Sequence, residues 1–186
     1  SVLRSGHRVS PILALWLPFF VPAGQPWLKV NRGITPAMHR VEMVRRAIAN
    51  NPYFKLSTLE VERPGPSYTV DTILTLREQL GTQVALFFIL GCDALTELPL
   101  WKEPTKLVQL CHLVIIPRQG SKLPDLKSLG KSVPGVSNSV IQLAMPIIDI
   151  SSSEIRKRVA QGLSIHYLVP DEIEEYIVKQ KLYSKL

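Results

Sequence analysis

The sequence predicts an α/β fold in which a doubly wound, mainly parallel sheet forms one domain over residues 1–186. First, strand-like and helix-like segments alternate along the chain. Second, two runs, at residues 85–90 and 113–116, are apolar throughout, which is typical of parallel strands buried on both faces. Third, 186 residues with 46% hydrophobic and 20% charged side chains suit a globular domain and argue against a disordered, collagen-like or coiled-coil chain.

In the first half of the chain, short apolar or alternating runs predict strands, and apolar residues three or four apart predict helices. Thr35 and Pro36 have the preferences of an N-cap and a first helical residue, and Gly81 has that of a helix end. The predicted elements are a strand at residues 17–21, a helix at 36–50, a strand at 55–61 and a helix at 70–80.

In the second half, a helix at residues 104–110 separates the two buried strands. Residues 119–139 are rich in Gly, Pro, Ser and Lys with little periodicity, which predicts a mobile loop. Ser151 and Glu154 form an S-x-x-E capping box at a helix start. The remaining predicted elements are a strand at 144–150, a helix at 151–162 and a final helix that opens at Pro170.

Charge and cysteine content narrow the partners and the compartment. The chain has 22 Lys and Arg against 15 Asp and Glu, and the net charge of +7 favours an anionic partner. Two cysteines cannot build a disulfide framework, so we expect a cytoplasmic protein. No apolar run reaches the length of a transmembrane helix, and Pro18 and Pro22 interrupt the one run that imitates a signal peptide. The histidines are too scattered for a metal site by spacing alone, at His7, His39, His112 and His166.

Ligands of doubly wound sheets bind at the carboxyl ends of the strands, and a candidate phosphate site follows the strand at 144–150. Ser151, Ser153 and Arg156 combine free backbone N–H groups of a helix N-terminus with hydroxyls and a guanidinium, which together suit a phosphate. The alternative interpretation is an ordinary capping box with a surface arginine.

Other candidates follow the remaining strands. Gly91 allows a ligand to approach the backbone, and Asp93 can accept ribose hydroxyls, unless the pair is only a turn with an N-cap aspartate. Trp101 is either a ring that stacks on a planar ligand or a core aromatic. Lys29, Arg40 and Arg118 are candidates for phosphate contacts, as against ordinary solvated side chains.

The strings typical of several large enzyme classes are missing from the sequence. There is no G-x-x-x-x-G-K, G-x-G-x-x-G, H-E-x-x-H or C-x-x-C string. This argues against P-loop, dinucleotide-fingerprint, zincin and thiol-redox proteins. The residues alone therefore indicate a basic α/β protein that binds a phosphorylated ligand.

Six strings stand in one order along about residues 19 to 183. They are residues 20–29 (V-P-x-x-x-P-x-x-K), the helix at 35–44, residues 66–72 (S-Y-T-x-D-T), Gly91 to Asp93 with Trp101 after it, residues 150–156 (I-S-x-T-x-I-R, with Ser153 for Thr) and residues 167–177. Together they resemble the strings of bacterial nicotinate-nucleotide adenylyltransferases. The resemblance implies a Rossmann-like nucleotidyltransferase fold with a short C-terminal helical part.

The resemblance also implies a reaction. Nicotinate mononucleotide attacks the α-phosphorus of ATP with the help of Mg²⁺, giving deamido-NAD and pyrophosphate in NAD biosynthesis, without nucleic acid or membrane as a partner. The resemblance implies that ATP is bound by Ser151, Ser153 and Arg156 at its phosphates and by Gly91 and Asp93 at its ribose. It implies that the nicotinate pocket is shaped by Tyr68, Thr69 and Trp101, and that further phosphate contacts come from Lys29 and Arg118.

The N-terminus departs from the family. Its members open with G-G-T-F-D-P-x-H-x-G-H. In this sequence only Gly6 and His7 correspond to part of that string, so residues 1–18 are atypical. Leu3 to Gly6 can be encoded by a string that reads Phe-Asp-Pro-Val in the next frame, which suggests the hypothesis of a frameshifted translation. We expect the sheet to lack its first central strand.

Three alternatives to the leading interpretation stay open. A catalytically impaired nucleotide-binding protein of the same fold would explain the atypical N-terminus. A nicotinamide-mononucleotide or pantetheine-phosphate adenylyltransferase would use a related acceptor. A basic nucleic-acid binder is supported only by the net charge of +7, without clustered basic residues.

Overall fold

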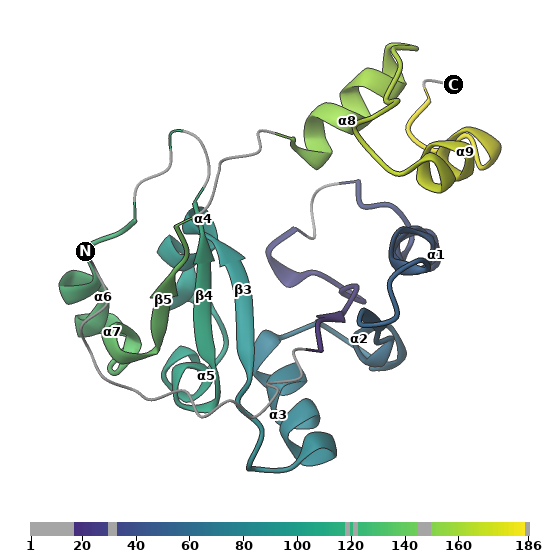
Figure 1. The fold of residues 1–186 in the computed structure, drawn as a ribbon. Coiled ribbons are helices and arrows are strands. Elements are labelled where there is room, and N and C mark those ends of the chain that lie inside the picture. Colours follow the sequence, from purple (N-terminus) through teal and green to yellow (C-terminus); the bar gives the residue numbers. More distant parts are fainter. Residues whose placement is uncertain (1–16, 30–32, 118–119, 121–122, 145–149, 185–186) are drawn as a thin grey trace.

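The computed structural model describes residues 17–29, 33–117, 120, 123–144 and 150–184 and is an α/β structure (Figure 1). Helices and parallel strands alternate along the chain, as predicted. In order, the elements are β1 (Phe19–Phe20), η1 (Trp27–Lys29), α1 (Ala37–Ile48), β2 (Lys55–Leu56), α2 (Leu59–Glu62), α3 (Thr69–Leu80), β3 (Phe87–Gly91), α4 (Cys92–Thr96), η2 (Leu98–Leu100), α5 (Pro104–Leu110), β4 (His112–Ile116), α6 (Leu126–Ser132), α7 (Val136–Ser139), β5 (Val140–Gln142), α8 (Ser152–Ala160) and α9 (Asp171–Lys179).

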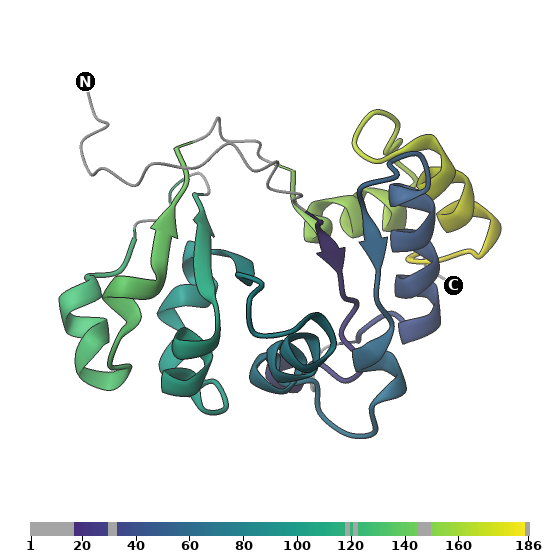
Figure 2. The ribbon, with the colours of Figure 1, turned by 60° about the horizontal axis from the view of Figure 1, so that its bottom comes forward.

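The strands form two parallel sheets. β1 pairs with β2, and β4 lies between β3 and β5, with Phe87 opposite His112 and Leu113 opposite Val140. Figure 2 shows the three-stranded sheet on one side and β1 with β2 on the other, where α1 and α9 lie beside them. Within the described ranges β1 and β3 each have a single neighbouring strand, so no strand joins the sheets there. Residues 1–16, where a first central strand would lie, are outside the described ranges, so its predicted loss stays a prediction.

The position of β3 at the edge of its sheet corrects one prediction. We expected both apolar runs to be buried on both faces. Leu113, Val114 and Ile115 of β4 are buried, because this strand is central. In β3, by contrast, Leu90 is buried while Ile89 is 59% exposed. An apolar run therefore indicated a strand correctly but not how many neighbours cover it.

Two hydrophobic clusters stabilise the fold. The larger surrounds β3 and β4 and includes Ile73, Leu95, Leu107 and Leu113. The smaller consists of Ile165, Ile173 and Ile177, against which Met43 of α1 and Ile155 of α8 pack. The second cluster fastens the predicted C-terminal helical part to α1. None of the helices in the described ranges is long and apolar enough to cross a membrane.

The strand predicted at residues 55–61 is wrong beyond Leu56. The chain turns into α2 at Leu59, where Glu60 is buried and accepts a hydrogen bond of 2.6 Å from the Thr72 hydroxyl of α3. Alternation along the sequence does not reveal this contact, since it depends on a partner twelve residues away. A buried carboxylate needs such a donor, and the bond fixes α2 against α3.

Residues 126–139, expected to be loop, form the short helices α6 and α7. Asp125 caps α6 by accepting hydrogen bonds from the backbone N–H groups of Lys127 and Ser128. The edge strand β5 follows at Val140–Gln142, earlier than the strand predicted at 144–150, of which residues 145–149 lie outside the described ranges.

The predicted N-cap of α1 is also wrong. Pro36, not Thr35, flanks the helix, and no side chain caps it. The Thr35 hydroxyl instead donates to the Tyr183 hydroxyl at 3.0 Å, so it binds the C-terminal part of the chain. The remaining helix boundaries agree with the sequence: α3 ends at Gly81, whose φ of 86° suits glycine, and α8 begins after the capping serine Ser151.

We expect Thr72→Val to lower the free energy of unfolding by about 1–3 kcal/mol, because the buried Glu60 carboxylate loses its donor. The measurement is urea unfolding at pH 7. Thr75→Val is the matched control on the same helix. Its hydroxyl accepts from Arg63, as that of Thr72 does, but it donates to the Asp71 carbonyl one turn earlier and not to a buried carboxylate, so its loss should stay within about 0.5 kcal/mol. Equal losses for the two variants would contradict a special role for the Glu60 contact.

Candidate functional site

The loop after β1 is fastened to the loop before α3. The Ser67 hydroxyl accepts hydrogen bonds from the backbone N–H groups of Gly24, at 2.8 Å, and Gln25, at 3.1 Å. The Ser67 N–H in turn donates to the Gln25 carbonyl at 2.9 Å. A Cβ on Gly24 would lie 2.1 Å from the carbonyl oxygen of Glu60, so only glycine allows this approach. Two strings far apart in the sequence are thus brought side by side.

Aromatic and charged side chains gather next to these loops. The Trp27 ring lies 5.8 Å from the Tyr68 ring, centroid to centroid. The Lys102 ammonium lies 4.9 Å from the Tyr68 centroid and 2.9 Å from a carboxylate oxygen of Asp71. We name these residues, with Trp101 that precedes Lys102, the Tyr68 cluster. The predicted residue Tyr68 flanks α3, where Thr69 is the first helical residue, and Trp101 belongs to the cluster as the chain neighbour of Lys102.

Trp101 has features of both interpretations weighed from the sequence. It is half-buried, packs against the larger core cluster and meets Phe88 edge-on at 6.0 Å. Its Nε1 atom is buried and has no hydrogen-bond partner among the described residues. An unpaired buried N–H costs about 1–3 kcal/mol, which the packing of the large ring can offset, so both interpretations stay open.

The carboxyl end of β3 carries Gly91 and Asp93, as predicted. Gly91 is the last residue of the strand and flanks α4, which starts at once with Cys92. Asp93 lies in the first turn of α4 and does not cap it, so the alternative of an N-cap aspartate is wrong. Its exposed carboxylate has no partner in the described part of the chain, which leaves it available to a polar ligand.

The start of α8 brings Ser151, Ser153 and Arg156 together. The Ser151 hydroxyl oxygen accepts from the Glu154 N–H at 3.1 Å, which is the cap predicted from the sequence. Arg156 donates from Nη2 to the Ser153 hydroxyl at 3.1 Å, and both side chains are exposed. The cap leaves the Ser151 O–H free to donate. Capping and phosphate binding are therefore compatible here.

Two predicted residues lie outside what the structure describes. Lys29 has a described backbone in η1 but no described side chain, and Arg118 is not described. Arg40, the third basic residue considered for phosphate, donates to the backbone carbonyls of Thr35 and Gly24 at 3.0 and 3.1 Å. Burial lowers the pKa of its guanidinium, although it stays charged at neutral pH. Arg40 therefore supports the loop.

Sequence reasoning did not single out Trp27, Asp71 or Lys102 for a role in binding. Trp27 and Asp71 lie within two of the strings, but no spacing rule joins them. Lys102 follows Trp101 directly, and this adjacency was the only signal available. The fold supplies what was missing, because Asp71 lies 31 residues before Lys102 in the sequence.

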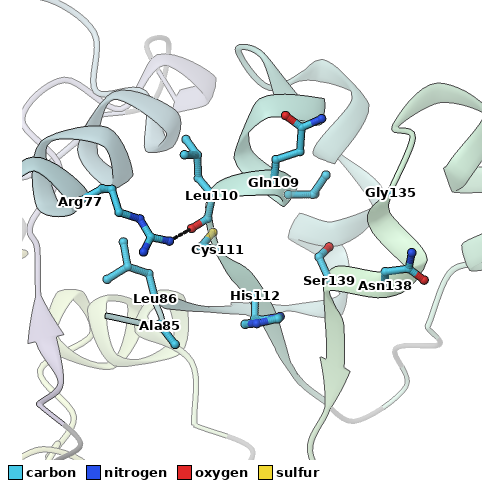
Figure 3. Close-up of a pocket in the computed structure, with 11 residues that line it drawn as sticks. Arg77, Ala85, Leu86, Gln109, Leu110, Cys111, His112, Gly135, Asn138 and Ser139 are labelled. Atoms are coloured by element: carbon cyan, nitrogen blue, oxygen red, sulfur yellow. Dashed lines mark hydrogen bonds between the residues drawn. The ribbon is translucent and has the colours of Figure 1, made fainter. Parts of the chain in front are cut away.

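A cavity of about 180 Å³ lies at the opposite end of the three-stranded sheet (Figure 3). Leu86 and Cys111, which directly precede β3 and β4, line it together with Arg77, whose guanidinium donates to the Leu110 carbonyl. Burial raises the pKa of the Cys111 thiol to about 12, so the thiol is neutral at physiological pH. None of the predicted site residues lines this cavity.

One group with the spacing of metal ligands lies at the start of α9. His166, Asp171 and Glu174 each offer an atom within 4.8 Å of the others, and His166 Nδ1 is 3.0 Å from Glu174. The spacing of histidines in the sequence did not indicate it, because the carboxylates come from the following helix. The group contains none of the predicted site residues.

Comparisons with known proteins show the family to which the chain belongs. The cytidylyltransferase-like family matches residues 12–158. A probable nicotinate-nucleotide adenylyltransferase of Dehalococcoides mccartyi is 42% identical, with 98% of this chain and 92% of the relative covered. One of Thermomicrobium roseum, of the same name, is 43% identical over 98% of this chain and 82% of its own length.

Among solved structures, the nicotinic acid mononucleotide adenylyltransferase of Plasmodium falciparum complexed with NaAD superposes with a TM-score of 0.71 at 25% identity. The match covers 92% of this chain and 85% of that one. The α/β fold with parallel sheets is thereby shared as a whole, not only in its local strings. The chain belongs to the cytidylyltransferase-like family and, within it, to the nicotinate-nucleotide adenylyltransferases.

Proposed function

We propose that this protein transfers the adenylyl group of ATP to nicotinate mononucleotide, forming deamido-NAD and pyrophosphate as a step of NAD biosynthesis. The observation that carries the proposal is the Tyr68 cluster, in which aromatic rings and a lysine ammonium meet beside the loop after β1. Aromatic faces suit the pyridine ring, and positive charge suits its carboxylate. Relatives of the same family name at 42% and 43% identity support it.

In this reaction a phosphate oxygen of nicotinate mononucleotide attacks the α-phosphorus of ATP. The bond from the α-phosphorus to the bridging oxygen breaks, and pyrophosphate leaves with that electron pair. We propose no covalent intermediate with the protein. The residues would contribute by positioning both substrates and by stabilising charge as it moves onto the leaving oxygen.

We assign the ATP side of the site to the ends of β3 and the start of α8. Arg156 and the hydroxyls of Ser151 and Ser153 would bind phosphate oxygens. Gly91 would let the nucleotide approach the backbone, and Asp93 would accept its ribose hydroxyls. Mg²⁺ would neutralise the triphosphate, and it commonly enters such sites bound mainly to the substrate phosphates and water, without an all-protein cage.

We assign the acceptor side to Tyr68, Thr69 and Trp101, which would shape the pocket of the pyridine ring. Lys29 and Arg118 would add positive charge for phosphate. The partners are then small molecules, not nucleic acid or a membrane. We place the protein in the cytoplasm, since both cysteines are free thiols and such thiols persist in a reducing compartment.

Pyrophosphate release from ATP tests the proposal. The purified chain is assayed with nicotinate mononucleotide, nicotinamide mononucleotide or pantetheine phosphate as acceptor, with a reaction without acceptor as control. We expect the highest kcat/KM with nicotinate mononucleotide. A higher value with either other acceptor would contradict the assignment, and pyrophosphate release without an acceptor would indicate ATP hydrolysis instead.

A catalytically impaired nucleotide-binding protein is the second candidate. It is favoured by the separation of the sheets, since β1 and β3 each have one strand neighbour in the described ranges and Ile89 is 59% exposed. Such a protein would bind ATP in the absence of turnover. Binding of ATP measured by calorimetry, beside the pyrophosphate assay, separates the two candidates.

We expect Arg156→Ala to lower kcat/KM for ATP about 10- to 100-fold, because a charge-assisted phosphate contact is worth about 1.5–3 kcal/mol. Lys157→Ala is the matched control, since Lys157 is the next residue of the same helix, is exposed and carries the same charge. It should change kcat/KM by less than about twofold. Equal effects of both variants would indicate a general loss of positive charge and would remove Arg156 from the site.

A further inference from the structure

Resting on the proposed function, we propose that Lys102 determines the specificity of the acceptor pocket: its ammonium pairs with the pyridine carboxylate and so selects nicotinate mononucleotide over its neutral amide analogue. The two acceptors differ only in this substituent, which is an anion in one and an uncharged amide in the other. A cation near the ring can therefore distinguish them by charge.

The ammonium of Lys102 is held in a fixed place at the start of α3. It lies 3.0 and 2.9 Å from the two carboxylate oxygens of Asp71 and 4.9 Å from the centroid of the Tyr68 ring. Tyr68 and Asp71 are three residues apart, so both lie on the same side of the first turn of the helix. Many lysine side chains on a surface have no partner, whereas this one contacts both Asp71 and Tyr68.

The Lys102 side chain is also accessible. It is 41% exposed and that of Asp71 is 28% exposed, so a ligand can reach the pair. An ammonium has three N–H donors, and the described partners of Lys102 account for two of them. The third donor is available to an anion that lies against the Tyr68 ring.

The Tyr68 ring beside this donor has a second aromatic ring next to it. Trp27 lies at 5.8 Å from Tyr68, and Trp101 is the residue directly before Lys102. A planar anion such as a pyridine carboxylate matches this combination, because its ring can pack on an aromatic face while its carboxylate reaches the ammonium. A phosphate group would use the charge of Lys102 but not the rings.

Asp71 increases the discrimination between nicotinate mononucleotide and its amide analogue. With Lys102 present, the carboxylate of Asp71 is neutralised and orients the ammonium. Without Lys102, the same carboxylate would repel the nicotinate carboxylate and would accept a hydrogen bond from the amide of the analogue. Removal of the lysine charge should therefore reverse the preference between the two mononucleotides as well as weaken the binding of one.

The test measures the Kd of each mononucleotide for the full chain by calorimetry, which does not require turnover. We expect Lys102→Met to raise the Kd of nicotinate mononucleotide about 10- to 100-fold, while the Kd of nicotinamide mononucleotide stays the same or falls. Lys102→Arg keeps the charge and should retain most of the preference. The control is Lys106→Met, since Lys106 has similar exposure, pairs with Glu103 at 3.5 Å and lies outside the Tyr68 cluster.

Each outcome of these Kd measurements supports or overturns the proposed role of Lys102. Equal increases in both Kd values would overturn the proposal, because they would mark Lys102 as a support of the pocket and not as its charge sensor. An unchanged preference in a folded Lys102→Met protein would overturn it too, and would leave the proposed function intact if the parent chain binds nicotinate mononucleotide. A parent chain that binds neither mononucleotide would overturn both the inference and the proposed function. Should Lys102→Met unfold, the same comparison is made with Lys102→Arg and Lys102→Gln.

Discussion

The contact of Gly24 with the backbone of Glu60 is the constraint on which the acceptor side of the molecule depends. A Cβ at position 24 would lie 2.1 Å from the Glu60 carbonyl oxygen, so the loop after β1 can lie on α2 only because it has glycine there. Ser67 then binds two N–H groups of that loop, and the Glu60 side chain binds Thr72 of α3. Through these contacts Trp27 reaches Tyr68, and the start of α3 receives Lys102.

The ATP side depends on a different part of the fold. Gly91 and Asp93 are carried by β3 and α4, which belong to the larger core cluster, whereas α8 packs through Ile155 on the smaller cluster with α1 and α9. The two groups of residues assigned to ATP are thus anchored in separate cores. In the described ranges no strand joins the sheets that these cores cover. Because β3 has one neighbouring strand in the described ranges, this arrangement favours the second candidate, a catalytically impaired nucleotide-binding protein.

Sequence patterns predicted those parts of the fold that local physics determines. The helices α3, α5, α8 and α9 have helical periodicity together with start or stop residues, and β4 is an apolar run with strands on both sides. Three features depend on tertiary contacts and were not predictable in this way. Residues 59–62 become helical where Glu60 meets Thr72, and residues 126–139 form short helices whose composition resembles a loop. Ile89 is exposed in β3, which has one neighbouring strand in the described ranges.

The residues of the candidate site also fall into two groups, those that the sequence predicts and those that only tertiary contacts bring together. Ser151, Ser153 and Arg156 lie within six residues, and one helix start brings them together as the sequence predicts. Lys102 gave no such signal, because a lysine beside a tryptophan is ordinarily solvated. Its importance depends on Asp71 and Tyr68, which reach it only through the packing of α3 against the segment after η2.

Pairing with Asp71 gives Lys102 a property that a lone lysine does not have. A free surface ammonium attracts every anion weakly and without direction, and salt screens that attraction. An ammonium with two N–H groups directed at one carboxylate has a net charge near zero as seen from a distance, and it presents a single remaining donor at a defined place. Attraction of this kind acts only at contact and only where the Tyr68 ring lies. Selectivity for a ring that carries a carboxylate, among the many phosphorylated anions of a cell, follows from that restriction more than from the positive charge itself.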